Sequence, residues 1–247
     1  MDRFRLDNKV VLVTGASSGL GVAFAIACAE AGAKVVATAR RAQWLDETVA
    51  AIKDIGGEAV AVSADVSVEA DCVRIVEETM QRFGRLDVLV NNAGVSDHSP
   101  ASRMQTQEFQ QVIDVNLTAC FWTAKAAAAV MAPGSTIINV SSVMAHTTVD
   151  LPTTAYLASK AGLLGLTRSL ARQWSGRKGI RVNALLPGWF PSEMTEEMPE
   201  ALLASRLVLG RLGDPQELAA ALVFLASDAS SYMTGAELLV DGGFRIA

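Results

Sequence analysis

The sequence predicts an α/β fold: a doubly wound parallel sheet of about seven strands, with helices on both faces, in a single domain spanning residues 1–247. Short β-branched and apolar runs alternate with segments of helical periodicity along the whole chain. A glycine-rich turn directly follows the first of these runs. The 247 residues, with 51% hydrophobic side chains, are enough for one large core, and no linker or repeat interrupts the alternation. Such sheets bind ligands beyond the carboxyl ends of their strands.

Strands and helices are expected to alternate through the chain. The run at 10–13 is uniformly apolar, as in a strand buried on both faces. Leu45, Val49 and Ile52 recur at helical spacing, and the glycine pair after Ile55 ends that helix. The expected strands are 10–13, 34–39, 59–63, 88–91, 136–140, 180–186 and 237–240. The expected helices are 22–31, 43–55, 68–83, 106–131, 155–174 and one that starts at 215.

The glycine-rich turn at 14–21, with the sequence TGASSGLG, is predicted to bind an anion. Its three glycines allow tight backbone angles and the close approach of a ligand. Ser17 and Ser18 add hydroxyl and main-chain N–H groups where the next helix begins, and a helix N-terminus attracts phosphate. The spacing is neither the G-x-G-x-x-G fingerprint nor that of a P-loop, so a turn without a ligand is the alternative.

Composition argues against several classes of partner. A formal net charge of -5, without any basic run, argues against nucleic acid. Three cysteines without a C-x-x-C pattern favour reduced thiols and a cytoplasmic protein. The charged first residues do not read as a secretory signal, and Lys125 interrupts the most alanine-rich helix before it could span a membrane. With only His98 and His146 and no clustered ligands, no metal site is predicted.

The end of the second expected strand indicates which dinucleotide binds. An NAD site usually places an acidic residue there against the ribose 2′-hydroxyl. This chain instead continues with Arg40 and Arg41, and Arg40 can pair with a 2′-phosphate. NADP(H) is therefore preferred and NAD(H) possible, with a solvated arginine pair as the alternative. After the third strand, Asp65 and Val66 are placed to hold the adenine ring, unless Asp65 simply caps a helix.

The segment Tyr156-Leu157-Ala158-Ser159-Lys160 carries the chemistry. On a helix, Tyr156 and Lys160 lie one turn apart on the same face, where the ammonium can stabilise a phenolate. This would lower the pKa of the tyrosine from about 10 toward the range useful for proton transfer. The same spacing also occurs by chance on solvated helix faces. Motifs elsewhere in the chain are therefore needed to distinguish a catalytic pair from a solvated one.

Several motifs follow one another in a familiar order. They are T-G-x-x-x-G-x-G at 14–21, N-N-A-G at 91–94 and Y-x-x-x-K at 156–160. Ser142 ends the fifth strand region, and Pro187-Gly188 precedes Ser192. In this order the chain resembles the short-chain dehydrogenases and reductases over essentially its whole length. The resemblance implies a Rossmann-like fold and an NAD(P)(H)-dependent oxidoreductase that interconverts a carbonyl and an alcohol.

The resemblance also implies roles for individual residues. Tyr156 would transfer a proton to or from the substrate oxygen, and Ser142 would hydrogen-bond the same oxygen. Lys160 would lower the Tyr156 pKa and bind the nicotinamide ribose, while Asn116 would position a relay water. Together with the glycine turn and Arg40, the expected cofactor-binding residues are Gly15, Ser17, Ser18, Gly19, Leu20, Gly21, Arg40, Asp65, Val66, Asn92, Ala93, Gly94, Tyr156, Lys160, Pro187, Gly188 and Ser192.

Two loops are expected to meet the substrate. The loop 143–155 is one residue longer than in many members of the family, and a second loop covers about 187–212. Ser192 stands where threonine is common and keeps the hydroxyl. The side chains expected near the reaction site are Met144, His146, Leu151, Trp189, Phe190 and Met194, with His146 facing either substrate or solvent. This apolar set favours an alcohol or ketone with a hydrophobic part.

Other readings of the family resemblance remain open. The main alternative is a 3-oxoacyl carrier-protein reductase, which needs basic residues beside the pocket. Arg177 and Lys178 could supply part of that surface, although 131–135 lacks basic residues. A more remote alternative is a dinucleotide sensor without activity, against which the complete catalytic set argues. The family's usual homotetramer would use the helices 106–131 and 155–174, whose apolar residues could equally cover the sheet.

Overall fold

The computed structural model describes residues 2–193 and 206–247. They form one sheet of seven parallel strands in the order β3-β2-β1-β4-β5-β6-β7. The strands are β1 (Val10–Thr14), β2 (Lys34–Ala39), β3 (Glu58–Ser63), β4 (Val88–Asn91), β5 (Thr136–Val140), β6 (Arg181–Pro187) and β7 (Glu237–Val240). The predicted fold class is confirmed, and every strand lies within one residue of its expected bounds. The strand order reverses between β1 and β4, which is where ligands bind in such sheets.

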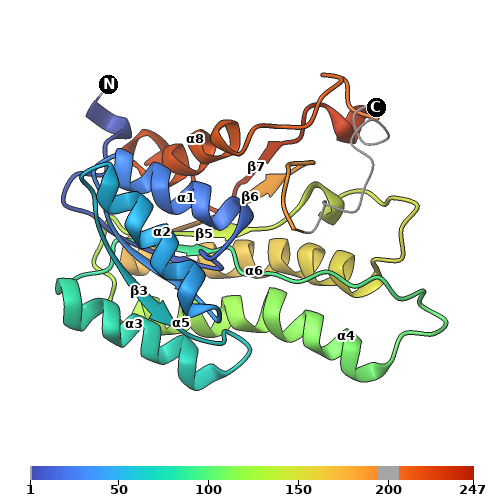
Figure 1. Ribbon diagram of the computed structural model, residues 1–247, viewed down its shortest axis with the longest axis horizontal. Coiled ribbons are helices and arrows are strands. Elements are labelled where there is room, and N and C mark those ends of the chain that lie inside the picture. The colour runs from blue at the N-terminus through green and yellow to red at the C-terminus, as the bar shows by residue number, and fades with distance from the viewer. Residues whose placement is uncertain (1, 194–205) are drawn as a thin grey trace.

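Helices cover both faces of the sheet (Figure 1). One layer consists of α1 (Gly19–Glu30), α2 (Ala42–Asp54) and α8 (Pro215–Ala226). The other consists of α3 (Glu69–Phe83), α5 (Ala119–Val130) and α6 (Thr154–Lys178). The helix expected at 106–131 forms as α4 (Thr106–Ile113) and α5, joined by a π-helical turn at Asp114–Thr118. Such π turns often accompany functional sites.

The alternation of side chains along β1 divides the core. Val11 and Val13 belong to the apolar cluster beneath α1, α2 and α8, whereas Val10 and Leu12 belong to the cluster beneath α3, α5 and α6. All residues of this strand are buried because both faces are covered. Fully burying each such side chain contributes about 1.5–3 kcal/mol. The centre of the sheet is therefore a rigid base for the loops at its carboxyl edge.

Helix α6 runs from the carboxyl edge of the sheet to the amino edge. It has 25 residues, which corresponds to about 37 Å, and it ends at Gly179 in the left-handed conformation with φ 66°. Tyr156 and Lys160 lie in its first two turns, whereas Arg177 and Lys178 lie in its last turn. Within one chain, Arg177 and Lys178 therefore lie at the opposite end of α6 from Tyr156 and Lys160. Lys178 donates to the carbonyl of Ala128 at 2.7 Å.

The three cysteines are free and buried. Among residues 2–193 and 206–247, no helix combines the length and apolar character needed to cross a bilayer. The same residues contain no cluster of three or more histidine, cysteine or carboxylate side chains suited to a metal ion.

Candidate active site

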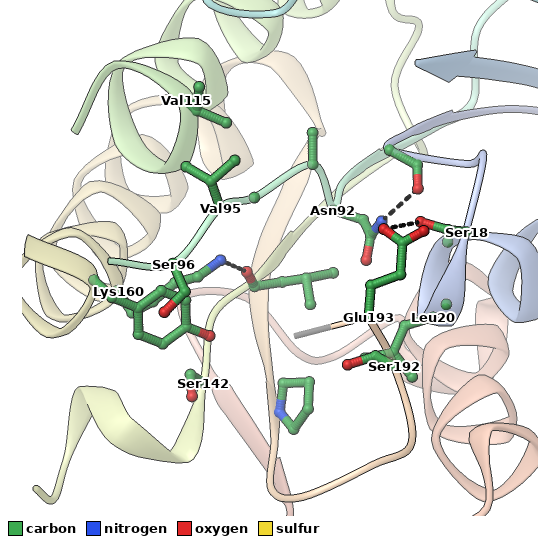
Figure 2. A pocket seen from close by; sticks show the side chains of 18 of the residues that line it. Ser18, Leu20, Asn92, Val95, Ser96, Val115, Ser142, Lys160, Ser192 and Glu193 are labelled. Atoms are coloured by element: carbon green, nitrogen blue, oxygen red, sulfur yellow. Dashed lines mark hydrogen bonds between the residues drawn. The ribbon is translucent and has the colours of Figure 1, made fainter. Parts of the chain in front are cut away.

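A cavity of about 550 Å³ opens at the carboxyl edge of the sheet. It extends from the glycine turn and the arginine pair to Ser142 and Tyr156, and every residue predicted to bind the cofactor lines it. Its volume lies within the usual range for sites that hold organic ligands. Figure 2 shows Ser142 and Lys160 on one side of this cavity, and Ser18, Leu20 and Glu193 on the other.

The glycine turn is shaped by contacts that leave no room for side chains. Gly15 has a φ of +68°, and a Cβ on it would lie 2.8 Å from the Cα of Ala93. A Cβ on Gly21 would run into the carbonyl oxygen of Gly15. Thr14 Oγ1 accepts hydrogen bonds from the main-chain N–H groups of Asn92 and Ala93, each at 3.0 Å. The turn and the N-N-A-G segment thus form one cradle at the start of α1, which fits a diphosphate.

The predicted catalytic serine, tyrosine and lysine converge beyond β5. Ser142 follows the strand by two residues, and its Oγ accepts a hydrogen bond from Met144 N at 3.1 Å. Lys160 is only 4% exposed, and its Nζ donates to the carbonyl of Val140 at 2.9 Å. Burial lowers the pKa of Lys160 from 10.5 to about 8. The ammonium therefore loses its proton far more readily than a solvated lysine.

The pKa of Tyr156 is not lowered, as the sequence-based prediction expected, but raised. Burial raises the pKa of Tyr156 above its usual value of 10, while a hydrogen bond with Ser142 acts in the opposite direction. Lys160 Nζ lies 5.6 Å from the centre of the tyrosine ring and bonds the main chain instead. Direct lowering of the Tyr156 pKa by Lys160 is thus not found. The i, i+4 spacing brings the two side chains together but does not determine where the ammonium donates.

Asn116 lies behind the cavity within the π-helical turn and is fully buried. Its Oδ1 accepts from Val95 N at 2.9 Å, and its Nδ2 donates to Val95 O at 2.9 Å and to Ser159 Oγ at 3.1 Å. Ser159 in turn donates to the carbonyl of Tyr156 at 2.7 Å. The asparagine therefore ties the strand-end segment after β4 to the first turn of α6.

Sequence reasoning missed Asp97, which is 2% exposed. Its two carboxylate oxygens accept hydrogen bonds from Tyr156 N at 2.8 Å and from Ala155 N at 3.2 Å. These N–H groups belong to the first turn of α6, whose own N-cap, Thr153, makes no side-chain cap. A residue 59 positions away from Tyr156 therefore caps the helix, and no local pattern could reveal it.

Arg41 is a second cation at the end of the cavity farthest from Tyr156. The sequence-based prediction of NADP(H) used Arg40 alone. Both arginines line the cavity. The Arg41 guanidinium lies 3.6 Å from the centre of the Trp44 ring and donates to Ser18 Oγ at 2.9 Å. It also pairs with Glu193 at 3.1 Å. Because Arg41 belongs to another loop, its contact with the glycine turn depends on the tertiary fold.

Residues 15–245 match the family model described as "Enoyl-(Acyl carrier protein) reductase". A 3-oxoacyl-[acyl-carrier-protein] reductase from Thermotoga maritima is 39% identical, covering 98% of this chain and 100% of the relative. A 3beta-hydroxysteroid dehydrogenase from Eggerthella lenta is 44% identical, covering 98% and 95%. The relatives thus share nearly the whole chain but differ in substrate.

Solved structures agree with these matches. A short-chain type dehydrogenase/reductase from Mycobacterium marinum is 35% identical, with a TM-score of 0.95 over 100% of this chain and 99% of that chain. This chain belongs to the short-chain dehydrogenase/reductase family. A blue fluorescent protein from a metagenomic library, solved in complex with NADPH, is 35% identical, with a TM-score of 0.92 over 97% and 99%. As a short-chain dehydrogenase/reductase, the protein is an NAD(P)(H)-dependent oxidoreductase.

The segment after β3 carries the residues that the sequence predicts to hold the adenine ring. Asp65 and Val66 line the cavity as predicted. Asp65 Oδ1 accepts from Ser67 N at 3.0 Å and Ser67 Oγ at 2.7 Å, so it stabilises a turn. Helix α3 begins at Glu69 with Val68 as its N-cap, so the alternative in which Asp65 caps the helix is wrong.

Most of the apolar side chains expected near the reaction site line the cavity. Met144, Leu151, Trp189 and Phe190 line the cavity, whereas Met194 lies outside the described residues. His146 does not line it. Its Nε2 pairs instead with Glu237 on β7 at 2.5 Å. The interpretation that places His146 at the substrate is therefore wrong. Met144 and Trp189 also belong to one buried apolar cluster, together with Val143, which directly follows Ser142.

Proposed function

We propose that this enzyme interconverts a carbonyl compound and a secondary alcohol, with NADP(H) preferred over NAD(H). The observation that carries the proposal is the continuous cavity between the arginine pair and Ser142. A cavity of this extent can hold a dinucleotide with its phosphates at the glycine turn and its nicotinamide beside Tyr156 and Lys160. The NADPH complex of the similar fluorescent protein supports the same choice of cofactor.

The cofactor would be held along the whole cavity. The N–H groups at the start of α1 would bind the diphosphate, and Arg40 with Arg41 would bind the 2′-phosphate. Asp65 and Val66 would border the adenine, and the segment 92–94 would border the ribose. Pro187, Gly188 and Ser192 would border the nicotinamide. When bound, the nicotinamide donates or accepts the hydride at the substrate carbon.

The chain itself handles the proton. Tyr156 donates its phenolic proton to the substrate oxygen during reduction and accepts it during oxidation. Ser142, which hydrogen-bonds the phenol, would also bond the substrate oxygen and stabilise the developing negative charge. Lys160 would bind the nicotinamide ribose and supply positive charge next to Tyr156. Asn116, through Val95 and Ser159, positions the helix turn that carries the tyrosine.

The apolar side chains also bear on the substrate and on the assembly of the enzyme. The apolar cluster that contains Met144 and Trp189 favours a ketone or alcohol with a hydrophobic part. Phe121 and Val130 of α5 are 41% and 40% exposed, which supports a homotetramer built on the α5 and α6 faces. Sedimentation as a monomer at micromolar concentration would contradict this assembly.

A second candidate is the reduction of a 3-oxoacyl thioester on an acyl carrier protein. The relative from Thermotoga maritima, which matches over its full length, favours it. Within one chain, however, Arg177 and Lys178 lie at the far end of α6 from the cavity. This candidate would require turnover of a 3-oxoacyl carrier-protein thioester to exceed that of the same acyl group on a small thiol.

The experiment is a screen of NADPH consumption with ketones, β-keto esters, sugars and acyl thioesters. The proposal expects turnover of an apolar ketone or β-keto ester, and a higher kcat/KM with NADPH than with NADH. Arg40→Asp should reverse part of that preference, because the carboxylate repels a 2′-phosphate and accepts from a 2′-hydroxyl. A wild-type preference for NADH would overturn the cofactor assignment.

A further inference from the structure

One carboxylate already occupies the arginine end of the cavity. Glu193 lies in the cavity wall next to Ser192, and Figure 2 shows its side chain extending to Ser18 of the glycine turn. Its Oε1 accepts from Arg41 Nη1 at 3.1 Å, and its Oε2 accepts from Arg41 Nη2 at 3.2 Å. Oε2 also accepts from Ser18 Oγ at 3.3 Å. A single anion thus engages both the arginine and the serine.

Arg41 has supports other than Glu193. The Trp44 ring lies beneath its guanidinium, and Nη2 also donates to Ser18 Oγ at 2.9 Å and to Ser17 Oγ at 3.4 Å. A guanidinium presents its donors in a planar fork that accepts a carboxylate or a phosphate equally well. The arginine and the two serines therefore form a preorganised anion site, and the Glu193 carboxylate occupies it.

We propose that Glu193 competes within the chain for the site of the NADP(H) 2′-phosphate and thereby sets discrimination between NADP(H) and NAD(H). This inference rests on the proposed function for its cofactor. A 2′-phosphate that bonds Arg41 must displace the Glu193 carboxylate, or else lie beside it against like-charge repulsion. The 2′-hydroxyl of NAD(H) is uncharged, so it need not displace the Glu193 carboxylate and is not repelled by it. Glu193 therefore weakens the binding of NADP(H) and leaves that of NAD(H) nearly unchanged.

The test is the Glu193→Gln variant, which keeps the size of the side chain and removes its charge. NADPH and NADH are titrated separately into the protein without substrate, and dissociation constants are read from cofactor fluorescence. Because exposed ion pairs are modest in strength, the variant should bind NADPH about three- to ten-fold more tightly than wild type. Its Kd for NADH should stay within about two-fold.

Two comparisons make the result specific. Glu58→Gln removes the same charge from an exposed pair with Lys34, 2.7 Å apart, at the opposite edge of the sheet. It should leave both dissociation constants unchanged, which excludes an effect of net charge alone. In an Arg41→Gln background, Glu193→Gln should no longer tighten NADPH, because the shared partner is absent.

Several outcomes would overturn the inference. Glu193→Gln could bind NADPH more weakly than wild type or equally well, or could change the Kd for NADPH and for NADH by the same factor. The fourth such outcome is that Glu193→Gln still tightens NADPH binding in the Arg41→Gln background. In all of these the wild type still binds the dinucleotides, so the proposed function survives. Binding of neither cofactor by the wild type would instead overturn the proposed function together with the inference.

Discussion

The two ends of the cavity are built in opposite ways. At the catalytic end, Lys160 and Asn116 are almost completely buried and bond main-chain groups. At the arginine end, the side chains of Arg41 and Glu193 are 43% and 50% exposed and bond each other. Buried polar networks are strong and costly to leave half satisfied, whereas exposed ion pairs contribute about 0–1 kcal/mol. We therefore expect the catalytic end to determine whether the reaction occurs, and the arginine end to adjust which cofactor is favoured.

The largest effect should come from Tyr156→Phe, which keeps the ring and removes the transferable proton. Carbonyl reduction, measured as kcat/KM with NADPH, should fall by about 10²–10⁴-fold. Tyr232→Phe is the matched control, because the other tyrosine is fully exposed on the surface. It should leave the rate unchanged. Retention of most activity by Tyr156→Phe would remove the tyrosine from its proposed role.

Asp97→Ala tests whether a buried carboxylate positions the tyrosine from a distance. Losing the acceptor for two helix N–H groups should lower stability by about 1–3 kcal/mol and kcat by about ten-fold. Asp214→Ala removes a comparable cap, which accepts from Gln216 N at 2.9 Å at the start of α8. That variant should lose stability but keep kcat. Asp97→Asn, which retains one acceptor, should fall between wild type and Asp97→Ala, and equal kcat in all four proteins would contradict a positioning role.

The buried lysine should make stability depend on pH. Below pH 8, Lys160 is protonated in both the folded and the unfolded chain, so its burial penalty is fully present. Between about pH 8 and 10.5 the folded chain loses the proton first, and the free energy of unfolding should rise by up to about 1.4 kcal/mol per pH unit.

Denaturant unfolding of wild type and Lys160→Met at pH 7, 8 and 9 measures this effect. The wild type should gain stability relative to the variant as the pH rises. The range stops at pH 9 because burial raises the pKa of Cys28 and Cys120 from 9.0 to about 12. Above pH 9 these thiols lose their protons in the unfolded chain first, which lowers the free energy of unfolding. Parallel curves for the two proteins would show that the lysine is not perturbed.

The smallest effect should come from Trp44→Leu at the arginine end. Removing the ring beneath Arg41 should weaken NADPH binding by about two- to five-fold, because an exposed cation–π contact is worth about 0.5–1 kcal/mol. NADH binding should not change. Phe83→Leu is the control, because it removes a similar cation–π contact at the far edge of the sheet. Lys34 Nζ lies 5.6 Å from the centre of the Phe83 ring. An equal loss for both cofactors would mean that Trp44 supports the fold, not the arginine.

The sequence was a reliable guide to the fold because its signals are local. Buried parallel strands require apolar runs, and those runs placed all seven strands. It also identified many residues of the cavity wall, since motifs at the carboxyl ends of parallel strands necessarily meet at one edge, although it did not point to Glu193. It was less reliable for side-chain partners. His146 hydrogen-bonds Glu237, and Lys160 donates to the carbonyl of Val140. Neither partner can be predicted from spacing along a helix or loop.

By itself, the sequence determined the order of the elements, the cradle of glycines and the set of polar residues at the carboxyl edge. Only the tertiary structure decided which of these residues touch. Asp97 reaches Ala155 across 58 positions, and Arg41 reaches Glu193 across 152. Such pairs join loops whose separation depends on the order of strands in the sheet. Local propensity acts over a few residues, so it cannot specify contacts that the packed core creates.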